Sequence, residues 1–169
     1  MKDLHLAIPI ATVLMLTCQL SQSAKIPLVK LPELSVTSAA PCEPTLPDAL
    51  GPFYKPSAPE RSGVGQGYVL SGMVKSSVDC STIERARIEF WLAGPNGQYD
   101  DRHRATIFSD KSGAYRFESN FPPQYSGRPP HIHIRVSAKG YQTLITQHYP
   151  TVGQTQATFD LVLIPGRDQ

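Results

Sequence analysis

Proline and glycine set the strongest limit on how this chain can fold. The 169 residues include 16 prolines and 12 glycines, and both residue types interrupt long helices. Six of the prolines fall within residues 41–59, so this stretch is expected to be extended and loop-like. With 40% hydrophobic and 18% charged residues, the chain still has enough apolar material to form a core. These features predict a turn-rich, all-β domain and disfavour a helical bundle.

The N-terminus has the pattern of a secretory signal peptide. Lys2 precedes an apolar stretch over residues 6–16, and small and polar residues follow at 21–24. The apolar stretch is shorter than the ~20 residues that a membrane-spanning helix needs. We therefore predict a signal peptide over residues 1–23, a flexible arm or linker over 24–40, and one domain over 41–169. The mature protein would be periplasmic or extracellular and free of the membrane, although a lipoprotein with its lipid on Cys18 remains an alternative.

Cysteine content and net charge narrow the options further. Removal of Cys18 with the signal leaves Cys42 and Cys80, and an even number of cysteines in an exported protein predicts a disulfide. The alternative is a pair of free, buried thiols. The net charge is only +2, and no basic run could follow a phosphate backbone, so a nucleic-acid partner is not expected.

Short alternating segments predict the strands. In residues 86–92, Ala86, Ile88, Phe90 and Leu92 share one face while charged residues and a tryptophan take the other, as in a half-buried strand. Residues 115–118 and 158–163 alternate in the same way, and 68–74 and 144–149 are weaker candidates. Turn-forming residues separate these segments. We predict an antiparallel β-sandwich of about seven or eight strands with long loops.

One predicted strand has an unusual polar face. His131, His133 and Arg135 alternate with three aliphatic residues, and residues two apart on a strand project to the same side. Both imidazoles could therefore reach one metal ion. An ordinary solvated strand face is the alternative for this pattern alone.

Four motifs stand in order along the chain: Gly-Pro-Phe-Tyr at 51–54, Gly-Gln-Tyr-Asp at 97–100, Arg-Pro-Pro-His-Ile-His at 128–133 and Leu-Ile-Thr-Gln-His-Tyr at 144–149. Together they resemble the intradiol aromatic ring-cleavage dioxygenases, in particular the protocatechuate 3,4-dioxygenase and catechol 1,2-dioxygenase group. The resemblance extends from about residue 42 to residue 163, which is nearly all of the predicted mature chain.

The resemblance implies one mononuclear non-haem iron(III), held by Tyr99, Tyr125, His131 and His133. Iron(III) is a hard cation that favours anionic oxygen, and metal binding drives deprotonation of its ligands. Tyr125 would also act in catalysis by helping to remove a proton from the substrate. Arg128 would offset negative charge that develops on the ring.

The resemblance also implies the reaction and the partners. A small aromatic diol and O2 would react, with ring opening between the two hydroxylated carbons to give a muconate-type diacid. Gln147 and Tyr149, with Arg128, would contact the substrate. The stretch between Tyr125 and Arg128 is short for this family, and the helical dimerisation region of catechol 1,2-dioxygenases has no counterpart, so the choice of catechol and the presence of a homo-oligomer stay open.

Two alternatives share the strand pattern. A secreted, non-catalytic sandwich of the transthyretin-like or carbohydrate-binding kind would hold no metal, and a periplasmic copper- or zinc-binding protein would need only His131 and His133. The remaining aromatic residues are expected to pack rather than to bind metal: Tyr54, Tyr115 and Tyr141, with Trp91 beneath the site, while His103 and His148 are expected at the surface or behind the ligands.

Overall fold

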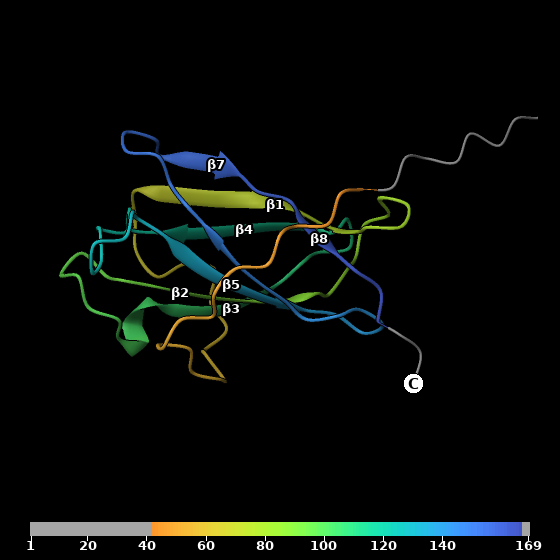
Figure 1. Cartoon of the computed structure of the whole chain (residues 1–169), viewed down its shortest axis with the longest axis horizontal. Coiled ribbons are helices and arrows are strands. Elements are labelled where there is room, and N and C mark those ends of the chain that lie inside the picture. Colours follow the sequence, from red (N-terminus) through yellow and green to blue (C-terminus); the bar gives the residue numbers. More distant parts are fainter. Residues whose placement is uncertain (1–41, 167–169) are drawn as a thin grey trace, which may run out of the picture. The chain divides into compact units, whose positions relative to one another are not determined.

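A computed structural model describes residues 42–166. The predicted signal peptide and the whole predicted arm over residues 24–40 lie outside the described residues. Within the described part are eight strands and one short 3₁₀-helix (Figure 1). No helix in this part of the chain is long and apolar enough to span a membrane. The elements are β1 (Tyr68–Ser76), β2 (Arg87–Leu92), η1 (Asp101–His103), β3 (Arg104–Phe108), β4 (Ala114–Ser119), β5 (Ile132–Ser137), β6 (Leu144–His148), β7 (Gln156–Thr158) and β8 (Leu161–Leu163).

The strands form two four-stranded sheets, which confirms the predicted β-sandwich. One sheet has the order β3-β2-β5-β6 and is antiparallel throughout. In the other sheet β4 pairs with β1 in antiparallel fashion, whereas β7 and β8 both run parallel to β1. The sandwich is thus mainly antiparallel, as predicted, and the two short strands β7 and β8 are the parallel exceptions.

The predicted strand over residues 158–163 is divided between β7 and β8. Phe159 and Asp160 lie between the two strands, and the Asp160 side chain takes hydrogen bonds along β1. Its carboxylate accepts from the Met73 N–H at 2.9 Å and from Lys75 Nζ at 2.6 Å. The Phe159 N–H still donates to the Ser71 carbonyl of β1, but the next contact with β1 is made by the Asp160 side chain, and the predicted strand is divided there.

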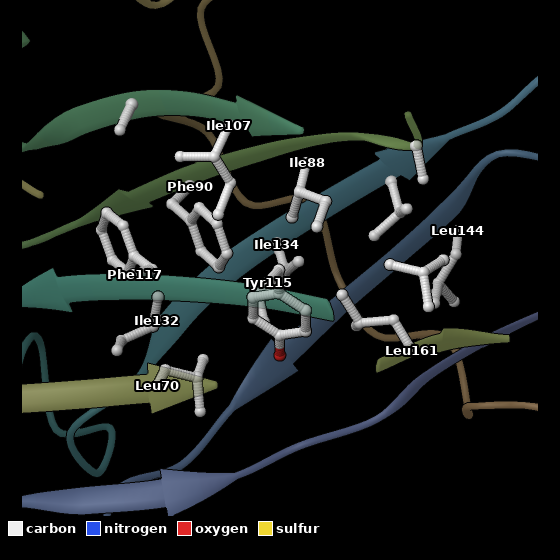
Figure 2. Packing of buried hydrophobic residues seen from close by; sticks show 14 of the residues in the cluster. Leu70, Ile88, Phe90, Ile107, Tyr115, Phe117, Ile132, Ile134, Leu144 and Leu161 are labelled. Atoms are coloured by element: carbon white, nitrogen blue, oxygen red, sulfur yellow. The ribbon is translucent and has the colours of Figure 1, made fainter. Parts of the chain in front are cut away.

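The core lies between the sheets and contains the aliphatic faces predicted from the sequence. Figure 2 shows Phe90 of β2 beside Phe117 of β4, and these rings stack with centroids 4.1 Å apart. Ile132 and Ile134 of β5 are fully buried in the same cluster. Because these two residues face inward, the residues that alternate with them face the opposite side of the sheet.

That opposite side is also covered, so the prediction of a half-buried β2 was wrong. Glu89 and Trp91 are each only 2% exposed. Tyr54 from the proline-rich segment packs its ring against Trp91 at 5.2 Å, and its hydroxyl lies 3.3 Å from Glu89 Oε1. Further along, the Arg61 N–H donates to the Thr106 carbonyl at the edge strand β3. Residues 51–61 therefore form a cover over the outer face of the β3-β2-β5-β6 sheet.

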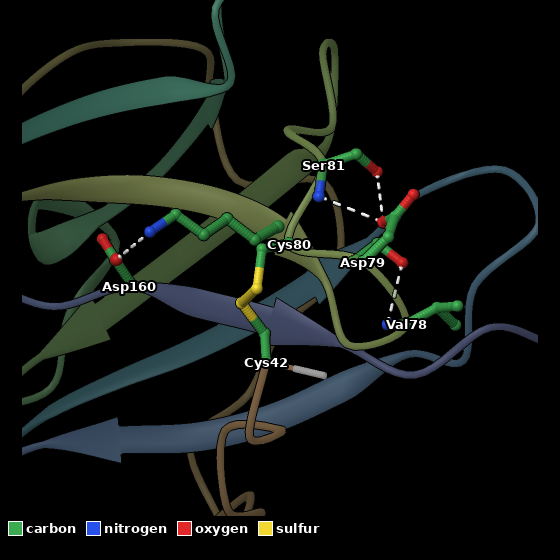
Figure 3. The surroundings of a disulfide bond; sticks show 8 residues. Cys42, Val78, Asp79, Cys80, Ser81 and Asp160 are labelled. Carbon is green, nitrogen blue, oxygen red and sulfur yellow. Dashed lines mark hydrogen bonds and ion pairs between the residues drawn. A yellow bond between two sulfur atoms is a disulfide. The ribbon is translucent and has the colours of Figure 1, made fainter. Parts of the chain in front are cut away.

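The start of the described chain is fixed by a disulfide and by backbone pairing. Cys42 and Cys80 are bonded, with their Cα atoms 5.2 Å apart (Figure 3). Three residues later, the Thr45 N–H donates to the Val162 carbonyl, and the Val162 N–H donates to Thr45 Oγ1. These contacts hold the segment before the cover against β8.

Candidate metal centre and substrate pocket

Two histidines at the start of β5 form the base of the site. His131 and His133 are each 2% exposed and project from the face of the sheet that residues 51–61 cover. Their ring centroids lie 4.9 Å apart. Trp91 of β2 stacks almost parallel on His133, with centroids 5.0 Å apart, because the two residues are direct neighbours across the strands. Trp91 therefore packs beneath the site, as predicted.

Tyr99 reaches the histidines from the loop after β2. The Asn96 side chain and the left-handed Gly97 (φ 72°) form a tight turn there, with the Gln98 N–H bonded to Asn96 Oδ1. The turn directs Tyr99 back over the sheet, where its hydroxyl lies 2.9 Å from His131 Nε2. The Tyr99 ring also lies 5.9 Å from the ring of His133.

Tyr125 and Arg128 occupy the two ends of a two-residue hairpin turn. Ser126 (φ 50°) and Gly127 (φ 78°) both have left-handed conformations, as a type I′ turn requires. The Arg128 N–H donates to the Tyr125 carbonyl at 2.9 Å, so the two residues form a cross-strand pair. The Tyr125 ring meets the edge of Tyr99 at 5.1 Å. The short spacing noted in the sequence therefore brings a phenol and a guanidinium to the same wall of the pocket.

The cover completes the site. Phe53 stacks on Tyr99 with centroids 4.4 Å apart. Gly51 has a φ of 73°, and a Cβ at this position would lie 2.8 Å from His133 Cε1, so only glycine allows the chain to pass this close. The resulting cavity has a volume of about 310 Å³. Its walls are Pro52, Phe53, Tyr99, Tyr125, Ser126, Arg128, His131 and His133.

Burial controls the protonation of these groups. Burial lowers the pKa of His131, and it lowers that of His133 to about 4, assisted by the charges of His131 and Arg128. Burial also raises the pKa of Tyr99 to about 12, although the positive charge of Arg128 opposes it. Both imidazoles are therefore neutral near pH 7, and the Tyr99 phenol keeps its proton unless a cation replaces it.

The donor set suits a hard metal ion. His131 Nδ1 lies 2.8 Å from the Pro129 carbonyl, which can only accept a hydrogen bond, so the ring proton sits on Nδ1. The lone pair of Nε2 then faces the Tyr99 hydroxyl. A carbonyl behind the ligand imidazole is the usual way in which proteins orient a metal-binding histidine. Two neutral imidazoles and two phenols fit iron(III), because the phenols supply anionic oxygen on metal binding.

Arg128 is held from behind by β6. One of its terminal nitrogens donates to Gln147 Oε1 at 2.8 Å and to the Tyr149 hydroxyl at 2.9 Å. Gln147 is 4% exposed, whereas Tyr149 lies at the surface with 42% of its area exposed. Gln147 and Tyr149 were predicted to contact the substrate. In the structure Arg128 lines the pocket, and these two residues bind Arg128 from behind.

The structure separates the other aromatic candidates from this site. The Tyr115 ring lies in the core between the sheets, and Tyr141 packs against the core. His103 is buried, with Nδ1 2.8 Å from Asp100, so the surface position considered for it is wrong. His148 also faces inward, where Nε2 lies 2.7 Å from the Tyr68 hydroxyl.

Three residues near the site were given no role from the sequence. Phe53 lies in the Gly-Pro-Phe-Tyr motif at 51–54, but its stacking on Tyr99 depends on the fold of the cover. Arg104, which is 4% exposed, donates to the Phe53 carbonyl and places a second positive charge near Tyr99. Asp48 accepts a hydrogen bond from Tyr149 at 2.7 Å. Only their nearness in sequence to the motifs at 51–54 and 97–100 could have drawn attention to them.

The fold and the site together define a class of protein: a β-sandwich with two histidines and two tyrosines around one pocket. No protein-family model matches the chain. It is 28% identical over 150 residues to a chlorocatechol 1,2-dioxygenase of Cupriavidus pinatubonensis, covering 69% of this chain and 58% of that protein. The chain spans about half the length of the curated relatives it matches.

Two solved structures share the fold at similar identity. The dioxygenase domain of a dioxygenase and carbohydrate-binding protein fusion from Streptomyces sp. SirexAA-E matches with a TM-score of 0.66 and 26% identity, covering 73% of this chain and 100% of that one. An intradiol ring-cleavage dioxygenase from Tetranychus urticae matches with a TM-score of 0.59 and 25% identity, covering 64% of this chain and 65% of that one. The chain is therefore similar in sequence and in fold to intradiol ring-cleavage dioxygenases.

Proposed function

We propose that this protein is an iron(III)-dependent intradiol dioxygenase that opens a small aromatic diol between its two hydroxylated carbons. The observation that carries the proposal is the convergence of Tyr99, Tyr125, His131 and His133 on one pocket. The reaction adds both atoms of O2 to the diol and gives a muconate-type diacid, so it balances without an external reductant. Bound iron(III) would supply a Lewis acid that takes the two diol oxygens and activates the ring toward O2.

The protein residues have distinct tasks in this proposal. The positive charge of Arg128 is close enough to influence Tyr99, His131 and His133, so it can also offset negative charge on a ring bound among them. Tyr125, half-buried at the pocket wall, is the proposed acceptor of a substrate proton. Pro52 and Phe53 supply apolar surface for the ring. A cavity of about 310 Å³ is at the small end for ligand pockets, which suits a single ring.

The proposal extends to the compartment. The Cys42–Cys80 disulfide is the state expected of an exported protein, because cytosolic thiols are kept reduced. Together with the signal-peptide pattern at residues 1–23, it supports export to the periplasm or the cell exterior.

The decisive experiment combines metal analysis, visible absorption and oxygen uptake. Iron-loaded protein is expected to be coloured, because tyrosinate bound to iron(III) absorbs visible light, and to consume O2 with at least one member of a catechol panel. Tyr99→Phe and His133→Ala should lose iron or colour. Tyr141→Phe is the matched control, since Tyr141 only packs against the core, and it should keep both.

Two results would contradict the assignment. Full iron content and an unchanged spectrum in both ligand variants would show that these residues do not hold the metal. Tight binding of copper or zinc that ignores Tyr99→Phe, without colour or oxygen uptake after iron loading, would instead support a metal-binding protein that uses the histidines alone.

A further inference from the structure

Asp48 lies at the end of a hydrogen-bonded chain that leads to the pocket. Its Oδ2 accepts from the Tyr149 hydroxyl at 2.7 Å, and the same hydroxyl oxygen accepts from Arg128 at 2.9 Å. Gln147 joins Asp48 to Arg128 by a second route, because its Nε2 lies 3.4 Å from Asp48 Oδ1 and its Oε1 accepts from Arg128. Two parallel routes therefore connect one carboxylate to one guanidinium.

The chemistry of the partners gives both routes a fixed direction. A carboxylate can only accept, so the Tyr149 hydroxyl must point its proton at Asp48 and its lone pairs at Arg128. The Ala49 carbonyl can also only accept, and it takes Gln147 Nε2 at 2.7 Å, which turns Gln147 Oε1 toward Arg128. Arg128 meets two acceptors because Asp48 and the adjacent carbonyl orient them.

The backbone of Asp48 is independently anchored. Its N–H donates to the Ile145 carbonyl at 2.9 Å, and Thr146 Oγ1 donates to the Leu46 carbonyl at 2.9 Å. Both contacts are made to β6, the strand that carries Gln147 and ends just before Tyr149. A change of the Asp48 side chain should therefore alter the hydrogen-bond direction without moving the segment.

The ionisation state of Asp48 also favours its role as a hydrogen-bond acceptor. Burial acts to raise the pKa of Asp48, but the hydrogen bonds from Tyr149 and the Ala49 N–H, together with the charge of Arg128, lower it overall. Asp48 is therefore ionised near pH 7 and remains an acceptor there.

We infer that Asp48 is a positioning residue for Arg128: its carboxylate orients Tyr149 and Gln147 so that the guanidinium is held at the pocket wall. This inference rests on the proposed ring cleavage for its catalytic consequence, but not for the hydrogen-bond chain itself. Asp48 does not touch the pocket residues that would bind metal, so its effect should fall on turnover rather than on metal content.

The test uses Asp48→Asn, Tyr149→Phe and the double variant. Asparagine keeps the shape of aspartate but offers an amide donor, so the Tyr149 hydroxyl no longer has to point away from Arg128. In iron-loaded protein, Asp48→Asn should lower kcat by about 10-fold, within the range seen when residues behind a functional site are changed, with a smaller change in KM. If the two residues act in one chain, the double variant should lose no more than the worse single variant.

A second measurement does not depend on turnover. In metal-free protein, ¹⁵N NMR of the arginine side chains should show slow rotation of the Arg128 terminal nitrogens and faster rotation in Asp48→Asn and Tyr149→Phe. Arg128→Lys assigns the signal by removing it. Asp110→Asn is the matched control, because Asp110 is another exposed aspartate that accepts local hydrogen bonds in the β3–β4 turn, and it should change neither readout.

The outcomes distinguish a failure of the Asp48 inference from a failure of the proposed function. Wild-type kcat and wild-type Arg128 rotation in Asp48→Asn would overturn the inference, and so would kcat losses that multiply in the double variant. If iron-loaded wild-type protein consumes no O2 with any catechol, the proposed function fails. The NMR comparison still decides whether Asp48 positions Arg128.

Discussion

Removal of the disulfide offers a quantitative test of how this small domain is stabilised. The bond closes a loop with a sequence separation of 38 residues between Cys42 and Cys80. On the chain-entropy relation, a loop of this size restricts the unfolded chain by about 13 cal/mol/K, which is about 4 kcal/mol at 25 °C. The Cys42→Ser and Cys80→Ser double variant should therefore be about 4 kcal/mol less stable than the oxidised protein, with a melting temperature lower by about 15 °C.

The loss should be global rather than local. Thr45 keeps its paired hydrogen bonds to Val162, and Asp48 keeps its backbone bond to Ile145, without any help from the disulfide. The segment that leads into the cover should therefore stay in place in the folded variant. We expect iron content and oxygen uptake at 25 °C to be close to those of the wild type.

Urea unfolding at equilibrium, monitored by the fluorescence of Trp91, measures the difference in stability. Reduced wild-type protein is the control, since it should behave like the double variant. A loss below about 1 kcal/mol in both would refute the entropic reasoning. Loss of iron binding in a variant that is still folded would instead show that the disulfide positions the cover directly.

Two further predictions concern charge. Arg128→Ala should keep its iron and its spectral response to catechol but lose turnover by about 10²-fold or more, as for other preorganised electrostatic donors, and Arg128→Lys should rescue it only in part; wild-type oxygen uptake in the alanine variant would remove Arg128 from the mechanism. Burial lowers the pKa of His148 from 6.5 to about 4, so the unfolded chain binds its proton first as the pH falls. The stabilisation from neutral His148 is present above pH 6.5 and should decline between pH 6.5 and 4, by at most about 3 kcal/mol because solvent screens this partly exposed side chain. His148→Gln, compared with wild-type protein in urea unfolding across this range, should show a smaller decline, and identical pH profiles would contradict the assignment.

Alternation was sufficient to predict the sandwich and its core. Ile88, Phe90, Ile132 and Ile134 are buried between the sheets as the period of two requires. The same pattern misjudged the outer face of β2, because periodicity describes one strand and carries no information on what packs above it. Glu89 is buried there since Arg135 at 2.6 Å and Arg87 at 3.1 Å pair with its carboxylate beneath the cover.

The site could be predicted only in part from the sequence, because strand periodicity says nothing about how separate loops fold over the sheet. His131 and His133 share a strand, so their spacing alone brings them together. Tyr99 and Tyr125 come from separate loops, and their positions depend on turns whose left-handed residues, Gly97, Ser126 and Gly127, place the rings over the sheet. The resemblance to a family supplied these two residues, whereas no local pattern could have.

The N-terminal part of the domain connects stability with the site. The segment that begins at Cys42 carries Asp48 behind Arg128, Gly51 against His133 and Phe53 against Tyr99. Pro52 and Phe53 of the same segment line the pocket, so the pocket is complete only when the segment lies on the sheet. Any ligand that requires the closed pocket must also favour the docked segment, because binding to one state shifts the equilibrium toward it. A metal bound in the pocket would therefore stabilise the docked segment, whereas the disulfide stabilises the whole domain by restricting the unfolded chain.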